Sequence, residues 1–341
     1  MKLSCLVRDA AIRRKRCAPI CEELAELTLE TITTCNICDA AEVAVLTVSD
    51  RYGLPVRSGM CLRCGLIFLL DRFTAEGYTR FYQDYYRALG SVYLNRPITP
   101  KTLQEEQRRY ARSLIETFRG LLPLPAGTTL IDVGGSTGVV ATEFAGAYGM
   151  AATVLDPSPD ELEQARAAGH TTMCTLFETW EGTDEQFDLV LCNRTIDHFL
   201  DLKRALEKLR SLCKPSGYLL IDIVDVEMIR KRKGMLEGAI KVDHPYYLCN
   251  EIAAAILQEA GFAVVYREIA SSPERVTYLC RPGEVVQKDQ RPSAAWIRQR
   301  LRGLHENHLA VVEARRQPCD WRDVVRRKGY RLKNKLLRRS A

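Results

Sequence analysis

The sequence predicts an α/β protein built on a doubly wound sheet, with a small zinc-ribbon module before the sheet and basic helices after it. Residues 128–158 read as a strand, a glycine-rich turn, a helix and a second strand, with an aspartate ending each strand. Two C-x-x-C pairs lie upstream of this segment, and residues 291–341 are strongly basic. At 341 residues the chain is long enough for two domains with cores of their own.

The turn after the first strand has the features of a nucleoside-binding loop. Gly134 and Gly138 let the backbone approach a ligand where a Cβ would block it. Asp156 ends the second strand, where a carboxylate can accept hydrogen bonds from two ribose hydroxyls. A dinucleotide would require G-x-G-x-x-G, but Ser136 and Val139 occupy the later glycine positions. The pattern leaves open another adenosine ligand, or no ligand.

Charge narrows the choice of ligand. Asp132, two residues before Gly134, would repel a pyrophosphate and attract a ligand that carries an ammonium and a sulfonium. The segments Asp132-x-Gly134-x-Ser136-x-Gly138 and Val154-Leu-Asp156-Pro-Ser158 resemble motif I and the acidic second-strand motif of class I S-adenosylmethionine-dependent methyltransferases. The resemblance implies a Rossmann-like methyltransferase sheet with S-adenosylmethionine as cofactor, although Ser136 replaces the family's usual middle glycine. The cofactor-binding residues that it implies are Asp132, Gly134, Gly135, Ser136, Gly138, Asp156, Pro157 and Asn193.

Further elements complete the predicted sheet. Apolar periodicity and Gly/Pro boundaries predict helices over 159–168 and 251–260, and strands over 171–176, 187–192, 218–224, 262–268 and 276–280. The stretch from Phe187 to Ile223 also resembles the family's fourth-strand region, its Asn-x-x-x-(Glu/Asp)-His segment and its Lys-Pro-x-Gly turn. The methyltransferase domain is therefore expected to span residues 123–282.

Four cysteines predict a metal site. Cys35, Cys38, Cys61 and Cys64 form two C-x-x-C pairs, which can supply four thiolates to a tetrahedral Zn²⁺ ion. Strand-like residues between the pairs, at 43–48 and 56–59, would bring the two knuckles together. A closed four-thiolate site leaves no position for water, so this zinc would be structural, while redox or disulfide pairing is the alternative. The zinc-ribbon module is expected over residues 33–70, after an N-terminal extension of residues 1–32.

An aromatic stretch from Tyr78 to Tyr86 follows the second cysteine pair, within an expected helical linker or lid over residues 71–122. A knuckle of the form Cys-x-x-Cys-Gly-Leu-x-Phe, then an aromatic helix and a methyltransferase core, resembles a bacterial group of methyltransferases with an N-terminal zinc-binding domain. Several members of that group act on sugars, natural products or surface glycans. The resemblance puts the aromatic helix near the cofactor as part of a lid, and packing of the module onto the sheet is the alternative.

Three residues are candidates for acid–base chemistry. Asp197 and His198 directly follow the fourth strand, and His244 lies in the loop after the fifth. All three are expected at the carboxyl ends of the strands, where doubly wound sheets bind ligands. His198 could take a proton from a hydroxyl acceptor, with Asp197 or Asp201 orienting it, and His244 could act on the acceptor as base or as hydrogen-bond donor. The alternative for His198 is that it caps or packs the following helix.

Charge is unevenly distributed along the chain. Residues 291–341 hold 15 Lys and Arg against four acids, whereas residues 1–290 hold 34 against 39. An acidic catalytic part argues against nucleic acid as a partner. Within the basic extension, residues 283–341, the last helix could lie on an anionic membrane or pack its apolar stripe on the core. A short N-terminal apolar stretch and the lack of a spanning-length run predict a cytoplasmic protein, with a peripheral location at the inner membrane face as an option.

The leading hypothesis is a methyltransferase that transfers the methyl group of S-adenosylmethionine to a hydroxyl, or secondarily a carbon, of a sugar, cell-surface glycan or small metabolite. A zinc-containing RNA methyltransferase is one alternative, but Asn193-Arg-Thr-Ile196 stands where enzymes acting on exocyclic amines carry Asn-Pro-Pro-Tyr. A non-catalytic zinc-ribbon adaptor with a degenerate methyltransferase domain is the other. Intact Asp132, Gly134, Gly138 and Asp156 argue against it.

Overall fold

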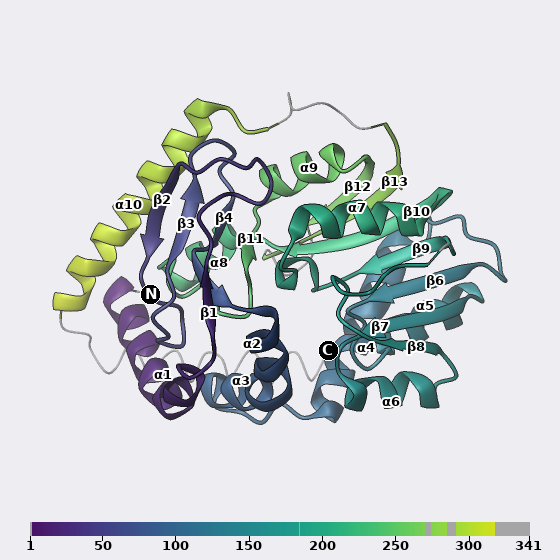
Figure 1. Ribbon diagram of the computed structural model, residues 1–341, viewed down its shortest axis with the longest axis horizontal. Coiled ribbons are helices and arrows are strands. Elements are labelled where there is room, and N and C mark those ends of the chain that lie inside the picture. The colour runs from purple at the N-terminus through teal and green to yellow at the C-terminus, as the bar shows by residue number, and fades with distance from the viewer. Residues whose placement is uncertain (1, 184, 270–273, 285–290, 318–341) are drawn as a thin grey trace.

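Two sheets form the centre of the protein, as the computed structural model shows for residues 2–183, 185–269, 274–284 and 291–317 (Figure 1). The larger has seven strands in the order β12-β13-β10-β9-β6-β7-β8. Strands β8, β7, β6, β9 and β10 are parallel, and β13 and β12 extend the sheet with antiparallel pairing. The strand bounds are β6 Thr129–Val133, β7 Ala151–Asp156, β8 Thr171–Cys174, β9 Phe187–Cys192, β10 Cys213–Val224, β12 Phe262–Ile269 and β13 Arg275–Pro282.

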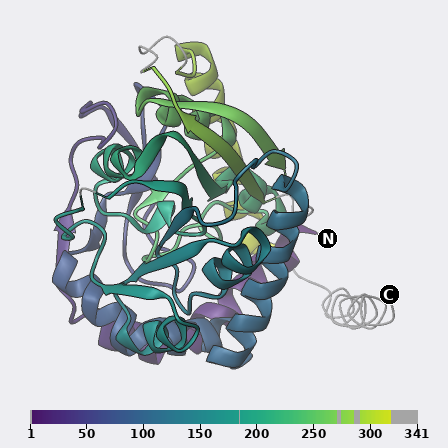
Figure 2. The ribbon, with the colours of Figure 1, turned by 90° about the vertical axis from the view of Figure 1, so that its right-hand side faces the viewer.

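Helices cover both faces of the seven-stranded sheet, as its doubly wound topology requires (Figure 2). Helices α4 (Pro100–Phe118), α5 (Val139–Tyr148) and α6 (Pro159–Ala167) pack on one face, while α7 (Leu202–Leu212) and α9 (Asn250–Glu259) pack on the other. The sequence of α7 explains both its packing and its start. Its leucines recur on one side and are buried against the sheet, and the Asp201 side chain caps its N-terminus by accepting from the N–H of Arg204.

The smaller sheet has the order β11-β4-β3-β2 and is antiparallel. Three of its strands come from the cysteine-rich segment: β2 (Val43–Thr47), β3 (Ser58–Cys61) and β4 (Ile67–Leu69). The fourth, β11 (Tyr246–Tyr247), comes from the loop after β10 and pairs with β4, so the two parts of the chain share this sheet. Figure 1 shows β11 on the side of the small sheet that faces the large one.

Helical segments surround the small sheet and connect it to the large one. Strand β1 pairs with β5, and helices α2, η1 and α3 contain the aromatic stretch, with a π-helical turn at η1. Helices α1 and α10 pack against each other beside the small sheet (Figure 1). The bounds are α1 Leu3–Leu24, β1 Leu29–Thr31, β5 Asp71–Phe73, α2 Ala75–Arg80, η1 Phe81–Tyr85, α3 Tyr86–Leu94, η2 Ile196–His198, α8 Val226–Lys233 and α10 Ala294–Arg316.

The predicted fold class is confirmed, and four local predictions need correction. Strand β10 begins at Cys213 rather than 218, because Cys213 already pairs with Phe187 across an irregularity. The strand expected at 56–59 lies at Ser58–Cys61. Helix α8 was not predicted after the fifth strand, and β11 was missed because its pairing partner is distant in sequence. Helix α10 is the first of the two expected basic helices, and the last lies outside the described residues.

None of the helices within the described ranges is long and apolar enough to cross a membrane.

Candidate functional site

The glycine-rich loop after β6 folds back onto the end of β7. Gly134 and Gly138 both have φ of +71°, and a Cβ at Gly134 would lie 2.5 Å from the side chain of Thr195. Ser136 also has a positive φ, +52°, which few residues other than glycine adopt. Its N–H donates to Asp156 Oδ2 at 2.9 Å. The loop therefore needs glycine for its own geometry, and it presents backbone at the carboxyl edge of the sheet.

Buried polar atoms without partners surround this loop. The Asp132 carboxylate is 2% exposed, and its Oδ2 has no hydrogen-bond partner among the described residues. The same holds for both polar side-chain atoms of Asn193, which follows β9. Burial, and then the charge of Asp156, raises the pKa of Asp132 to about 7. Buried polar groups are normally satisfied, so this edge of the sheet has the character of a site for a polar ligand.

Asp156 and its neighbours complete that site. The Asp156 carboxylate accepts from the N–H groups of Ser136 and Ser158, both at 2.9 Å. Burial nevertheless raises the pKa of Asp156 to about 6. Pro157 is exposed beside it, and a Cβ at Gly135 would lie 2.9 Å from the Asp132 carboxylate. All of the residues expected to bind a cofactor thus lie at the ends of β6, β7 and β9, with two carboxylates facing a backbone cradle.

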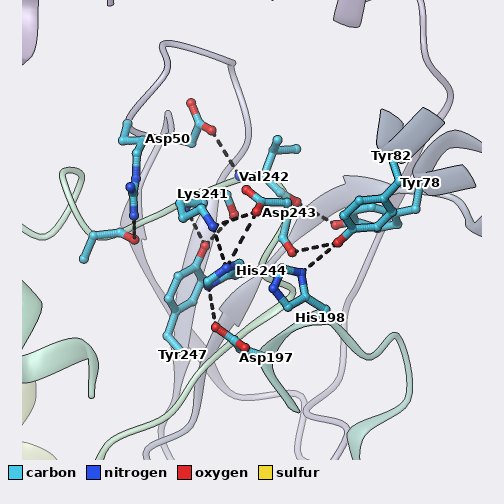
Figure 3. Close-up of polar contacts among 12 residues, drawn as sticks. Asp50, Tyr78, Tyr82, Asp197, His198, Lys241, Val242, Asp243, His244 and Tyr247 are labelled. Atoms are coloured by element: carbon cyan, nitrogen blue, oxygen red, sulfur yellow. Dashed lines mark hydrogen bonds and ion pairs between the residues drawn. The ribbon is translucent and has the colours of Figure 1, made fainter. Parts of the chain in front are cut away.

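A second cluster lies at the same edge, and Figure 3 shows its polar contacts. His244 Nδ1 is 2.7 Å from Asp197 Oδ2, and His244 Nε2 is 2.6 Å from Lys241 Nζ. Lys241 Nζ also pairs with Asp243 Oδ2 at 2.6 Å. His198 Nδ1 lies 2.8 Å from the Tyr82 hydroxyl, and the rings of His198 and His244 meet edge to face at 4.5 Å. We call Asp197, His198, Lys241, Asp243 and His244 the histidine cluster.

The contacts of His244 define the roles of its two nitrogens. An ammonium can only donate, so Nε2 accepts from Lys241 and Nδ1 carries the proton that it donates to Asp197. Although Asp197 is buried, His244 and His198 in their protonated forms would hold its pKa well below the usual range. Burial, and then repulsion from a protonated His244, lowers the pKa of His198 to about 4, so His198 is neutral at pH 7. The cluster therefore presents a histidine whose Nε2 can accept a proton.

One expected pairing is wrong. Asp197 contacts His244 rather than orienting His198, and Asp201 caps α7 and accepts from Asn36 Nδ2 instead. His198 bonds to Tyr82 of the aromatic segment, so it neither caps α7 nor stands apart from the cluster. Both predicted histidines and Asp197 are brought together. His305 and His308 are exposed on α10.

The small sheet holds the segment that carries His244. Asp50, which is fully buried, accepts from the N–H groups of Tyr52, Gly53, Leu54 and Val242 at 2.8–3.0 Å. The carbonyl of Val242 in turn accepts from the Tyr78 hydroxyl at 2.7 Å. The N–H of Leu69 in β4 donates to the Pro245 carbonyl on the other side of His244. Contacts from the N-terminal part therefore fix the backbone on both sides of this histidine.

Replacing Asp50 with alanine is expected to lower the free energy of unfolding by about 3 kcal/mol, because four buried N–H groups would lose their acceptor. Urea denaturation followed by circular dichroism measures this change. Glu313→Ala is the control, since Glu313 makes an exposed i,i+3 ion pair with Arg316, and it is expected to change the value by less than about 0.5 kcal/mol. Equal effects of the two substitutions would contradict the buried-acceptor role.

The four cysteines converge as the sequence predicts. Their Sγ atoms all lie within 4.8 Å of one another, with Cys35–Cys64 and Cys38–Cys61 at 3.5 Å. The two C-x-x-C turns match each other, because the fifth residue of each, Asp39 and Gly65, has a positive φ and donates to the carbonyl of the first cysteine. Zinc–sulfur bonds of about 2.3 Å put tetrahedral ligand sulfurs about 3.8 Å apart, so this buried set fits a Zn²⁺ ion. No comparable group of ligands forms around Cys17 and Cys21 within the described ranges.

Sequence reasoning missed three residues that shape the histidine cluster. Lys241 precedes His244 by three residues, but nothing in a loop sequence indicates that the two side chains meet. The contact between Asp50 and Val242 spans 192 residues, so no local pattern indicates it. Tyr82 was noted only as part of the aromatic stretch, and nothing in that stretch indicates that its hydroxyl contacts His198.

Comparisons with known proteins agree with this geometry. Residues 103–267 match the family model described as "Methyltransferase domain". The biotin biosynthesis bifunctional protein BioCD of Bordetella avium is 32% identical over 129 residues, covering 37% of this chain and 28% of that protein. The 27-O-demethylrifamycin SV methyltransferase of Amycolatopsis mediterranei is 24% identical, covering 62% and 75%, and the ubiquinone biosynthesis O-methyltransferase of Nitrobacter winogradskyi is 25% identical, covering 44% and 59%.

The chain thus spans less than two thirds of two of these three relatives. Solved structures also align with it, at 12–21% identity over 46–61% of this chain and with TM-scores of 0.38–0.44. The family match covers strands β6 to β10 and most of β12, together with the glycine loop, Asp156 and the histidine cluster. Residues 103–267 therefore form a class I S-adenosylmethionine-dependent methyltransferase domain.

Proposed function

We propose that the whole chain is a methyltransferase that methylates a hydroxyl group of a sugar, a cell-surface glycan or a small metabolite. The observation that carries the proposal is the Asp197–His244 pair, which lies at the same sheet edge as the glycine loop. S-adenosylmethionine supplies a methyl group on a sulfonium, whose leaving group is already good. The protein then has to align the acceptor in line with that methyl and, for a hydroxyl, remove a proton.

Each group of the histidine cluster would have a definite task. S-adenosylmethionine would supply the methyl group and keep the electrons of the broken C–S bond on sulfur, while Nε2 of His244 would take the proton of the acceptor hydroxyl. Asp197 stabilises the imidazolium that results, through the proton on Nδ1. Lys241 now occupies Nε2, so the acceptor has to displace it, and Asp243 remains as the partner of its ammonium. Asp156 would bind ribose, and Asp132 would face the cationic part of the cofactor.

The relatives support oxygen as the acceptor atom. One is named for O-methylation in ubiquinone biosynthesis, and another is a methyltransferase of 27-O-demethylrifamycin SV. The test is transfer of labelled methyl from S-adenosylmethionine to nucleotide sugars, lipid-linked glycans and phenolic metabolites, with transfer RNA as a competing class. Nuclear magnetic resonance of the product separates O-methyl from C-methyl. Labelling of RNA alone, or failure to bind the cofactor, would refute the proposal.

Two further parts of the chain enter the proposal. Zn²⁺ held by the four cysteines would stabilise the N-terminal module, with no water position for chemistry. The last residues of the basic extension, outside the described ranges, would contact an anionic membrane at the cytoplasmic face. Sedimentation with anionic vesicles, for the full chain and for a variant ending at residue 318, tests the membrane contact. Equal sedimentation of both proteins would exclude it.

Cofactor affinity is expected to depend on pH. The pKa of Asp132 is raised to about 7 and that of Asp156 to about 6 in the ligand-free protein, and a cationic ligand favours the ionised carboxylates. Binding must then release protons below these values. Affinity for S-adenosylmethionine should therefore rise between pH 5.5 and 7, by up to about tenfold per pH unit for each proton released, and level off above about pH 7.5.

Calorimetric titrations across this pH range measure the effect. Asp132→Asn is expected to weaken binding and to leave only the lower transition, near pH 6, from Asp156. An affinity that does not change between pH 5.5 and 8 would show that neither carboxylate is ionised by the ligand.

A further inference from the structure

Two arginines meet over one tyrosine beside the proposed site. The guanidinium carbons of Arg194 and Arg275 each lie 4.6 Å from the ring centroid of Tyr110. Arg194 directly follows Asn193 at the end of β9, Arg275 begins β13, and Tyr110 belongs to α4. Three elements distant in sequence therefore converge at the carboxyl edge of the sheet, next to the residues expected to bind the cofactor.

The buried donors of this cluster are not all satisfied. The carboxylate that the two arginines share is Asp222, which is fully buried. Its Oδ1 accepts from the backbone N–H of Arg194 at 2.6 Å, and its Oδ2 contacts the Tyr110 hydroxyl and lies 3.4 Å from Arg275 Nε. The Nε atoms of both arginines are buried without a hydrogen-bond partner among the described residues. Two guanidinium groups thus face one buried carboxylate, whose oxygens are already occupied by other donors, while the second nearby acid, Glu106 of α4, is exposed.

The backbone at Arg194 points to a role for its side chain. Arg194 has φ of +60°, a conformation that costs a residue with a Cβ and that glycine or asparagine would adopt more easily. Ser136 in the glycine loop is strained in the same way. Burial, and then the nearby charge of Arg275, lowers the pKa of Arg194, so the two like charges repel each other. Arg275 keeps 21% of its side chain exposed, so a ligand can reach the pair from solvent.

We propose that Arg194 and Arg275 bind a phosphate or diphosphate group of the acceptor. Paired guanidinium forks match phosphate oxygens in geometry and charge, and an anion would give hydrogen-bond acceptors to donors that now lack them. This inference rests on the proposed function. It narrows the acceptor to a phosphorylated molecule, in which the phosphate links the methylated group to a nucleotide or to a lipid. The position beside Asn193, at the edge that holds His244, would keep the acceptor's hydroxyl in reach of the histidine cluster.

The test is calorimetric titration of the full chain, saturated with S-adenosylhomocysteine, with pyrophosphate, uridine diphosphate and geranyl diphosphate at constant ionic strength. Wild-type protein should bind pyrophosphate saturably. Arg194→Ala and Arg275→Ala should each weaken it by about tenfold or more, and Arg275→Lys by less. Tighter binding of uridine diphosphate than of pyrophosphate identifies a nucleotide carrier, and tighter binding of geranyl diphosphate a lipid carrier.

Arg281→Ala is the matched control. Arg281 lies on the same strand β13 and stacks on Tyr218 at 5.0 Å, but at the opposite end of the sheet. The Arg281→Ala protein should bind pyrophosphate with the same affinity as the wild type. Equal affinity in the Arg194, Arg275 and Arg281 variants would overturn the proposal, and so would acetate binding better than phosphate.

Affinity for S-adenosylhomocysteine, measured on each variant, separates this proposal from the proposed function. If Arg194→Ala lowers that affinity and leaves pyrophosphate binding intact, the arginines hold the cofactor's carboxylate and the phosphate assignment fails. If neither the wild type nor any variant binds S-adenosylhomocysteine, the methyltransferase assignment fails. The pyrophosphate titration is then repeated on ligand-free protein, and it still tests the anion site.

Discussion

Replacing Cys61 with serine is expected to release the bound zinc and to lower methyl transfer by more than about a hundredfold, while cofactor affinity stays within about threefold. Structural zinc contributes on the order of 10 kcal/mol or more to the folding of small modules. Without the ion, strands β3 and β4 would lose their order. Strand β11 would then lose its pairing with β4, and the N–H of Val242 would lose its acceptor, Asp50. These two contacts hold the backbone on both sides of His244.

Cofactor binding should be affected much less, because its residues lie elsewhere. Asp132, Asp156 and the glycine loop belong to the large sheet, whose face under α4 and α5 has a hydrophobic core separate from that of the small sheet. The sharp contrast between lost turnover and retained affinity is what distinguishes a positioning role of the module from general unfolding.

Metal analysis, calorimetry with S-adenosylhomocysteine and turnover, all on one preparation, measure the three quantities. Cys213→Ser is the control, since Cys213 is also fully buried but lies in β10 away from the metal cluster. It should keep zinc and activity. A zinc-free Cys61→Ser protein with normal turnover would show that the module has no part in placing His244.

The parts of the site that are local in the chain could be predicted from the sequence. The glycine loop, Asp132 and Asp156 lie within one strand–turn–helix–strand unit of about 30 residues, so their relation in space follows from local periodicity. The cysteine pairs were equally accessible, because C-x-x-C brings two ligands together within a single turn and a metal site needs two such turns.

The histidine cluster was predictable only in part. Asp197, His198 and His244 were expected at one sheet edge because they follow adjacent strands. Their spacing in the sequence does not indicate which of them contact each other. Asp197 pairs with His244, 47 residues away, rather than with its neighbour His198. The β11–β4 pairing holds the segment that follows His244, and two-residue strands between distant segments leave no periodic pattern in the sequence.

Replacing His244 with alanine is expected to lower kcat by about 10²–10⁴-fold with cofactor affinity unchanged within about twofold, because a general base contributes on that order and His244 touches none of the residues expected to bind the cofactor. Asp197→Asn should give a smaller loss in the same direction, since an amide cannot stabilise the imidazolium. Single-turnover rates with labelled S-adenosylmethionine, next to calorimetry, separate chemistry from binding. His305→Ala, on the exposed face of α10, is the control and should behave like the wild type.

His198→Ala decides between the two histidines. If His244 is the base, the loss in the His198 variant should stay below about tenfold, reflecting only the missing contact with Tyr82 and with the His244 ring. The pH dependence of kcat provides an independent criterion. The pKa of His198 lies near 4, so an activity that falls only as the pH approaches 4 would identify His198 as the base. A pH dependence that disappears in His244→Ala, leaving a low and flat rate, would assign the base to His244.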